Sequence, residues 1–484
     1  MYDAFAGLIS QISGFMYSYL LIVMLLGVGL YFTFRSKFVQ LRLLPESIRV
    51  VGEKTGDQHS VSAFEALMVS TASRVGTGNI VGVANAIAIG GYGAVFWMWL
   101  IAIVGGATAF VESTLAQIYK KKDPEGGSYG GPSYYIQAAL KSRVLGVVFA
   151  IALIATYAGG FNMLASYNLI SSFTSYDFYA SAGTFTLGGK EYSVVAVVGG
   201  VILAILVAIC VLGGGKRIVK VTGVLVPVMG VLYILMALVV MVMNLNMIPS
   251  VLGRIFSEAF DFGAMFGGAV GFGSSAIMQG IKRGLYSNEA GVGSAPNAAA
   301  AADVSHPVKQ GLVQMLSVFI DTILVCTATA MMCLCTGIDI KGGLEGAPLV
   351  QASLATTFGA VGPYFITFAL LLFAFTTLLG NLFYCEGCLN YIANRKLGSV
   401  PMTVFRLIAC GLVFVGAQLS FGLVWDLADV LMGIMAIINL PVIVILGRTA
   451  MRALQDYMEQ RRAGKNPVFK ASSIGLKEKT DFGN

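Results

Sequence analysis

Glycines interrupt two of the long apolar runs in this chain, and polar groups accompany them. The first interruption has the sequence RVGTGN at 74–79, and the second has GGAVGFGSS at 267–275. A helix that stops in an apolar environment leaves N–H groups free for a carboxylate and carbonyl oxygens free for a cation. Tight helix packing is the alternative use of such glycines, but packing alone would not select Arg74 and Asn79. We therefore predict a site for a carboxylate and a cation at these interruptions.

Polar side chains in other apolar runs could complete an ion site. Asp321 is a carboxylate within one run, where it is costly unless it coordinates a cation or forms an ion pair with Arg74 or Arg406. Thr376 and Thr377 offer adjacent hydroxyls that could complete an oxygen shell around sodium, although such hydroxyls often bond to their own helix. Other carboxylates near the ends of apolar runs are interpreted as structural or gating groups, namely Glu65, Glu112, Glu386, Asp426 and Asp429.

The composition indicates that these groups belong to a membrane protein. Of the 484 residues, 57% are hydrophobic and 11% are charged, which is too few charges for a water-exposed surface. Apolar runs of about 20 residues recur along the chain, as in an all-α protein with many membrane spans in contact with lipid. Two histidines and seven scattered cysteines predict no zinc or other cofactor. No Ser/His or paired-Asp arrangement suggests an enzyme.

Hydropathy predicts about eleven transmembrane helices. Their orientation follows from the basic residues, because 26 of the 31 Lys and Arg fall in alternate loops, including the loop 282–309. This asymmetry predicts an outside N-terminus, a cytoplasmic C-terminus and a location in the cytoplasmic membrane, and it explains the net charge of +7 without nucleic acid. The predicted spans are 14–34, 62–91, 94–118, 144–171, 193–212, 221–243, 258–281, 310–336, 361–392, 401–421 and 424–447.

The two interruptions occupy corresponding positions in two halves of the chain. They fall in the second and seventh predicted spans, so each half has five spans and begins with an interrupted one. An odd number of spans inverts the second half relative to the first, and this pattern is typical of secondary transporters. A channel would also tolerate interrupted helices, but the paired arrangement favours a carrier. The predicted divisions are an N-terminal helix and linker (1–61), two repeats (62–243 and 244–447) and a cytoplasmic tail (448–484).

Four longer motifs resemble those of the alanine or glycine:cation symporter family. They are SRVGTGNI at 73–80, GAVFWMW at 93–99, GGPSYYI at 130–136 and SNEAGVGSAPNA at 287–298, in the family's order. The resemblance covers nearly the whole chain. It implies a leucine-transporter-like core of two inverted five-helix repeats with one extra N-terminal helix. It also implies that small neutral amino acids are taken up with sodium as the coupling ion or, less often, with protons.

The resemblance further implies which residues contact substrate and ions. Thr376 and Thr377 match the position of sodium ligands, facing carbonyls near Val75, and Asp321 with Asn79 resembles a second ion position. The loop 286–297 is expected on the cytoplasmic side as an inner gate, where Glu289 could pair with a basic residue. The implied contacts of the first interruption with substrate and ion are Gly76, Thr77, Gly78 and Asn79.

Two positions depart from the family pattern. Alanine or glycine carriers often have Gln where this chain has Ala165, and Trp where it has Asn381. Both positions are expected on helices that line the pocket. The departures predict a larger pocket with one amide facing it, so glutamine is an expected substrate beside alanine and glycine.

Overall fold

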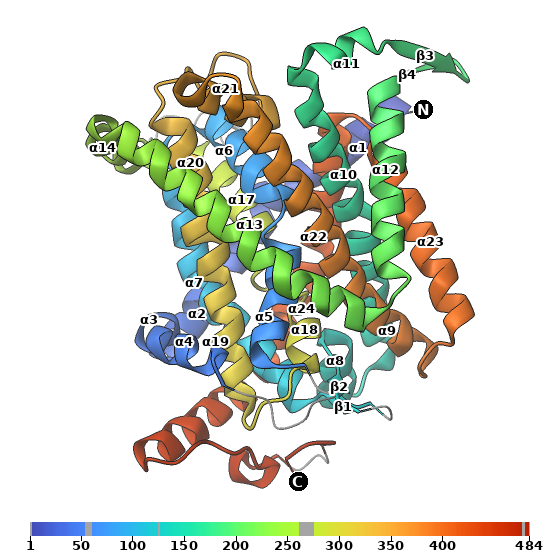
Figure 1. The fold of residues 1–484 in the computed structure, drawn as a ribbon. Helices are drawn as coiled ribbons and strands as arrows, with labels where there is room; N and C mark the ends of the chain where they lie inside the picture. Colours follow the sequence, from blue (N-terminus) through green and yellow to red (C-terminus); the bar gives the residue numbers. More distant parts are fainter. Residues whose placement is uncertain (1, 54–60, 124–125, 261–274, 477–479, 484) are drawn as a thin grey trace.

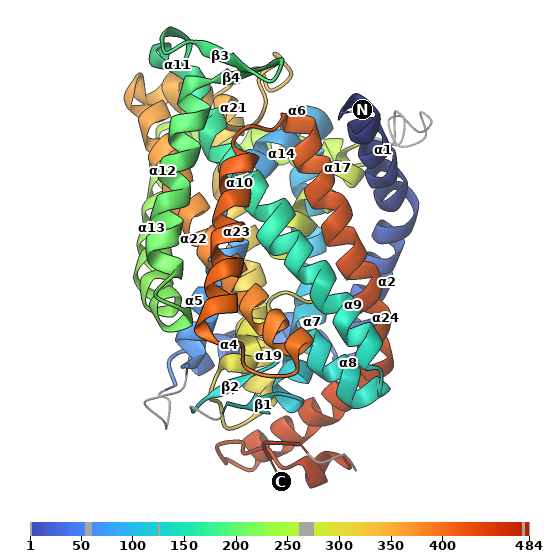
Figure 2. The same ribbon diagram turned by 90° about the vertical axis from the view of Figure 1, so that its right-hand side faces the viewer.

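The computed structural model describes residues 2–53, 61–123, 126–260, 275–476 and 480–483. Long helices run side by side between two faces of the molecule (Figure 1). One face carries the C-terminus, α8 and the strands β1 and β2, and we call it the C-terminal face; the opposite face carries α11, β3 and β4 (Figure 2). The many apolar helices define a multi-pass membrane protein.

Nine helical segments in the described part of the chain are long and apolar enough to cross a membrane. They agree with nine of the predicted spans, so hydropathy located these helices correctly. Several contain a stretch marked η, which is π-helical in η1, η3 and η6 and a 3-10 helix in η4. Their elements are α1 (Tyr2–Phe15), η1 (Met16–Leu21), α2 (Ile22–Arg35), α7 (Gly93–Ile118), α9 (Arg143–Ile154), η3 (Ala155–Phe161), α10 (Asn162–Ser171), η4 (Ser172–Ser175), α12 (Val194–Val211), α13 (Gly215–Met243), α19 (Pro307–Val318), η6 (Phe319–Cys326), α20 (Thr327–Leu334), α22 (Val361–Ala393), α23 (Ser399–Gly416) and α24 (Phe421–Arg462).

Shorter elements complete the two faces. The two small sheets are antiparallel hairpins, β1 with β2 and β3 with β4. Their bounds and those of the short helices are α3 (Val39–Arg42), α4 (Leu44–Val51), β1 (Lys121–Lys122), β2 (Ser128–Tyr129), α8 (Pro132–Leu140), α11 (Asp177–Ser181), β3 (Thr184–Leu187), β4 (Lys190–Ser193), η5 (Leu245–Met247), α14 (Ile248–Glu258), α21 (Gly346–Phe358) and η7 (Ala471–Ile474).

The second predicted span is interrupted where the sequence indicates. The helix α5 (Ala63–Arg74) begins with a capping box, in which Ser62 and Glu65 satisfy each other's backbone N–H groups. It ends before residues 75–77, which we call the first break, and the chain continues as η2 (Gly78–Gly82) and α6 (Val83–Gly90). The prediction of an interruption at 74–79 is confirmed.

The other interruption that the structure describes differs from the predicted one. The predicted segment 267–275 lies, apart from Ser275, outside the described residues. Two short helices, α17 (Ala276–Asn288) and α18 (Pro296–Ala301), flank residues 289–295, which we call the second break. Gly291 and Gly293 have φ of +86° and +89°, a left-handed conformation that favours glycine and ends a helix.

The second break lies deep in the molecule, and this corrects the predicted cytoplasmic loop 282–309. A Cβ on Gly105, near the middle of α7, would lie 2.8 Å from Cβ of Ala290. Residues 282–288 are helical, and their basic side chains are buried: Lys282 Nζ lies 2.8 Å and Arg283 Nη1 3.2 Å from the carboxylate of Asp429. This ion pairing is the physical reason that a charged segment lies among apolar helices.

The ends of the two interrupted helices meet on the C-terminal face. Val61 and Ala302 form a parallel β-bridge, and the backbone N–H of Asp303 donates to the carbonyl of Val61 at 2.8 Å. The segment after α24 joins the same contact, because the N–H of Phe469 donates to the carbonyl of Ser305 at 2.9 Å. The beginning of α5 and the end of α18 are therefore connected directly.

Candidate functional site

The hydroxyl of Thr377 points at the backbone of the first break. A Cβ on Gly76 would lie only 2.2 Å from Thr377 Oγ1, so no larger residue fits at this position without displacing the hydroxyl. Thr377 is buried, and its Oγ1 has no hydrogen-bond partner among the described residues. A buried hydroxyl without a partner is costly, and an oxygen beside an unwound backbone is a suitable cation ligand.

Thr376 is arranged differently, although the sequence predicted the same role for both threonines. Its Oγ1 donates to the carbonyls of Leu372 at 3.0 Å and Phe373 at 3.2 Å in its own helix. It also lies 3.4 Å from the sulfur of Met229 on α13. The hydroxyl is thus bonded back to α22, which is the alternative that the sequence left open.

Asn79 connects the first break to Asp321. Its Oδ1 accepts from the N–H of Gly76 at 2.8 Å, and its Nδ2 donates to Asp321 Oδ1 at 2.6 Å. Asp321 Oδ2 also accepts from the hydroxyls of Ser287 and Thr322. These side chains are fully buried, so the predicted pairing of Asn79 with Asp321 is present in the geometry.

The alternative that the sequence left open for Asp321, an ion pair with Arg74 or Arg406, does not form. Within the described ranges no Lys or Arg nitrogen lies within 4.0 Å of its carboxylate. Arg406 pairs instead with Glu386 at 2.7 Å, and Arg74 Nη1 donates to the carbonyl of Gln314 at 3.2 Å. A buried carboxylate without a basic partner is costly, so its oxygens remain candidate ligands for a cation.

The two positions that depart from the family pattern lie close to the breaks. Ala165 is fully buried on α10, one turn before Asn168, whose Nδ2 donates to Thr77 Oγ1 at 3.0 Å. The amide of Asn381 is occupied at both ends: Oδ1 accepts from Ser73 at 2.7 Å and Nδ2 donates to Asn162 at 2.9 Å. The amide that was expected to face the pocket is thus hydrogen-bonded to neighbouring side chains at both ends, and its contact with a substrate stays a prediction.

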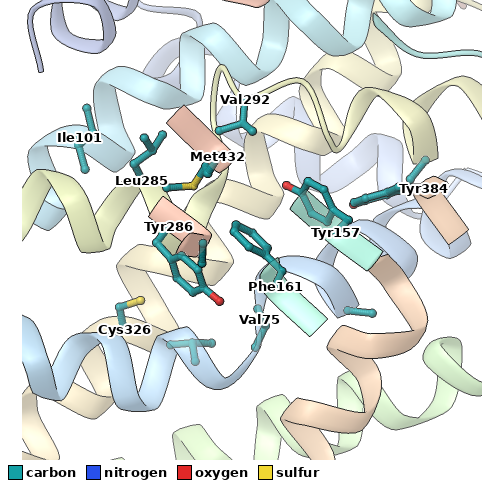
Figure 3. Packing of buried hydrophobic residues seen from close by; sticks show 14 of the residues in the cluster. Val75, Ile101, Tyr157, Phe161, Leu285, Tyr286, Val292, Cys326, Tyr384 and Met432 are labelled. Carbon is teal, nitrogen blue, oxygen red and sulfur yellow. The ribbon is translucent and has the colours of Figure 1, made fainter. Parts of the chain in front are cut away.

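Aromatic rings cover the first break. A Cβ on Gly78 would lie 2.2 Å from the ring of Tyr286, so this ring packs directly on the backbone. Tyr286, Phe161, Tyr157 and Tyr384 form a continuous row, with successive centroid distances of 4.8, 4.9 and 5.5 Å (Figure 3). Trp425 packs on the other side of Tyr286 at 5.0 Å. The rings close the site, and all of them are buried.

Buried carboxylates accompany the second break. Glu289 accepts from Ser294 Oγ at 2.6 Å and from Ser73 Oγ at 3.3 Å, so it is bonded to hydroxyls and not to the basic residue that the sequence suggested. Glu112 on α7 accepts from the N–H of Gly291 and from Asn439. The two breaks are thus joined through Ser73, which contacts both Glu289 and Asn381.

Sequence reasoning missed several residues of this site. Asn162 and Asn168 are polar residues inside an apolar run, the same signal that led to Asp321, and Ser287 begins a quoted motif. Tyr286 and Ser73 lie within the quoted motifs or beside them, and their contacts depend on the second break being deep in the molecule.

Interrupted helices among apolar spans, with buried oxygens beside them, define a membrane transporter. A manganese transporter from Eremococcus coleocola has a similar fold, with a TM-score of 0.51 at 12% identity over 86% of this chain and 84% of that one. The likeness at this identity concerns the fold alone.

The chain belongs to the sodium:alanine symporter family, whose model matches residues 2–471. It is 44% identical to the amino-acid carrier protein AlsT of Bacillus subtilis, over 99% of this chain and 97% of the relative. It is also 44% identical to the probable sodium/glutamine symporter GlnT of B. subtilis (94% and 91% coverage in the same order). The sodium/alanine symporter AgcS of Methanococcus maripaludis is 38% identical, with 95% and 98% coverage. Membership of this family supports amino-acid symport and agrees with the prediction of a transporter that is not an enzyme.

Proposed function

We propose that the chain is a sodium-driven symporter that imports small neutral amino acids across the cytoplasmic membrane by alternating access. The observation that carries the proposal is the buried hydroxyl of Thr377, which has no partner in the described part of the chain and points at Gly76. In the proposed orientation the C-terminal face is cytoplasmic and the N-terminus is outside, following the distribution of basic residues.

Sodium is proposed to bind between α22 and the first break. Thr377 Oγ1 and backbone carbonyls of the break, including that of Val75, would supply oxygen ligands without a fixed charge. Asp321, held by Asn79, is proposed as a second cation position. Thr376 Oγ1 contacts the sulfur of Met229 on α13 and donates within its own helix, so Thr377 is the threonine proposed as the sodium ligand.

The substrate carboxylate is proposed to bind the N–H groups at the beginning of η2, where Gly78 follows the break. A helix N-terminus offers free donors and a partial positive charge to an anion. Thr77 and Asn79 border this position, and the rings of Phe161 and Tyr286 limit the space for a side chain. Small neutral amino acids such as alanine and glycine suit this arrangement.

The proposed core is leucine-transporter-like, with inverted repeats over 62–243 and 244–447. The two breaks then occupy equivalent positions, one in α5–α6 and one in α17–α18. In alternating access the two sides open in turn, and opening toward the C-terminal face would separate α5 from α18. The bridge between Val61 and Ala302 would break in this step.

Sodium supplies enough energy for concentrative uptake. A tenfold sodium gradient is worth about 1.4 kcal/mol and a potential of 100 mV about 2.3 kcal/mol per charge. Together these support an accumulation of several hundredfold for a neutral substrate moved with one sodium ion.

Uptake of labelled alanine into proteoliposomes tests the proposal. Accumulation that saturates and requires an inward sodium gradient is expected, whereas a channel would not accumulate substrate. Loss of uptake with a protonophore, but not on collapse of the sodium gradient, would make the proton the coupling ion. Competition by unlabelled glycine, glutamine and glutamate then defines the substrate: glutamate must not compete, and competition by glutamine would add it to the substrates.

A further inference from the structure

Glu112 is a buried carboxylate that the proposed sodium and substrate sites do not use. It lies on α7 and is 0% exposed. No Lys or Arg nitrogen of the described residues lies within 4.0 Å of it; each of its oxygens instead accepts a neutral donor. The N–H of Gly291 donates to Oε1 at 3.4 Å, and Asn439 Nδ2 donates to Oε2 at 2.9 Å.

These contacts hold both backbone groups of Gly291. Asn439 Nδ2 also donates to the carbonyl of Gly291 at 3.0 Å, and the hydroxyl of Tyr135 donates to Asn439 Oδ1. Gly291 has φ of +86°, and a Cβ there would lie 2.8 Å from the side chain of Leu440. The conformation of the second break at this residue therefore depends on Glu112 and Asn439.

The charges around Glu112 leave it without a counterion in contact. The charged and titratable groups that interact electrostatically with it are Arg74 from α5, Glu289 from the second break, Tyr135 from α8 and Tyr384 from α22. Arg74 is the one basic side chain in this set, and the carboxylates of Glu289 and Asp321 also lie in its field. One guanidinium cannot neutralise three buried carboxylates, so the cluster requires additional positive charge.

A proton suits Glu112 better than a metal ion does. The groups that touch its oxygens are N–H donors, which offer no lone pair to sodium, whereas the hydroxyls of Ser287 and Thr322 beside Asp321 can turn their own oxygens to a cation. A carboxylate has only acceptors, whereas a protonated carboxyl carries one O–H donor. Protonation would therefore replace an acceptor that holds Asn439 or Gly291 with a donor.

We propose that Glu112 is a proton-binding residue that controls the second break. The ionised carboxylate fixes Gly291, and protonation releases it. An O–H bond forms with a proton from solvent when the site is open to one side and breaks when the proton returns to solvent. This adds a proton-dependent step to the proposed sodium-driven cycle. The experiment that tests it measures the conformation of the second break directly and does not require transport activity.

Hydrogen–deuterium exchange on the purified full chain in lipid nanodiscs tests the inference. Wild type and Glu112→Gln are compared at each pH between about pH 5 and pH 9, which removes the intrinsic effect of pH on exchange. At high pH we expect peptides covering 289–301 to exchange about tenfold or more faster in the variant, because a hydrogen bond to the charged group is lost. The difference should vanish as the pH falls.

Two outcomes would overturn the inference. A difference that is the same at every pH would make Glu112 merely structural, and no difference at any pH would show that it does not hold the break. Glu386→Gln is the control, because Glu386 is a partly buried carboxylate paired with Arg406 at 2.7 Å. This variant should leave exchange of 289–301 unchanged.

A second variant covers the case in which Glu112→Gln does not fold. Asn439→Ala removes one donor and retains Glu112, so the protection of 289–301 in this variant, corrected for the intrinsic effect of pH on exchange, should still fall as the pH falls. Protection that does not change with pH would overturn the inference here too. Absence of alanine uptake would contradict the proposed symport and would leave this measurement unaffected.

Discussion

The first and second breaks are both interruptions of a helix, but they are held by opposite kinds of groups. The direct side-chain contacts of the first break are a neutral amide and hydroxyls, with the carboxylate of Asp321 reached only through Asn79, and the hydroxyl of Thr377 there has no partner in the part of the chain that the structure describes. Carboxylates surround the second break, and their oxygens accept several hydrogen bonds. The first break is thus suited to bind an external ion, whereas the second is suited to change with its own charge.

The largest expected effect comes from closing the first break. Gly76→Ala places a Cβ 2.2 Å from Thr377 Oγ1, and overpacking of about 1–3 kcal/mol at the ion position should abolish sodium-dependent uptake. Gly230→Ala is the matched control, since a Cβ there meets nothing within 4 Å. Normal uptake by the Gly76 variant would show that the first break is not the ion site.

The two threonines of α22 should differ sharply. Thr377→Val removes the hydroxyl that points at Gly76, and loss of one ligand worth about 1.4 kcal/mol raises the half-saturating sodium concentration about tenfold. Thr376→Val removes a hydroxyl bonded to its own helix, so the shift should stay below about twofold. Sodium titration of uptake at matched expression measures both. Equal shifts would contradict the distinction drawn from the geometry.

A change at the second break should affect rate and not sodium affinity. Glu289→Gln keeps the size of the side chain but weakens its bonds to Ser294 and Ser73, which are worth about 1.5–3 kcal/mol when charged. We expect the maximal uptake rate to fall by roughly threefold to tenfold with the half-saturating sodium concentration unchanged. An altered sodium dependence with a normal rate would assign Glu289 to the ion site instead.

The smallest effect concerns the linker that follows α18. Burial lowers the pKa of His306 to about 4, although its bond to Asp456 opposes this shift. As the pH falls from about 6.5 to 4, the unfolded chain binds a proton at His306 that the folded state does not bind. The folded state is therefore stabilised by this histidine above about pH 6.5, and that stability is lost as the pH falls toward 4. His306→Asn should reduce this loss of melting temperature by a few degrees. An identical pH dependence in both proteins would contradict the assignment.

The sequence predicted the first break and its partners because glycines and polar residues inside apolar runs are visible without coordinates. Gly76, Asn79, Asp321 and Thr377 come together as expected. The separation of Thr376 from the site depends on which face of α22 meets the break, and two adjacent threonines do not reveal that.

The sequence did not predict the second break, for a physical reason, and the predicted interruption at 267–275 lies, apart from Ser275, outside the described residues. Hydropathy favours the glycine-rich segment at 267–275 over α17, which contains Lys282 and Arg283. Those charges are compatible with burial only because Asp429, more than a hundred residues later, pairs with both. Hydropathy is averaged over neighbouring residues in the sequence, so it cannot reveal an ion pair between residues far apart in the chain. The hydrogen bonds of the Asn381 amide are hidden for the same reason.

The helix α24 connects the two faces as a single rod. Its 42 residues correspond to about 60 Å of α-helix. Near one end Trp425 packs on Tyr286, in the middle Asn439 binds Gly291, and near the other end Tyr457 donates to Glu46. An α-helix resists stretching, so the distance between these contacts is set by one helix and not by loops. Insertions in loops should therefore leave the spacing of the two faces unchanged. Pro441 lacks an N–H and is the position at which this helix can bend.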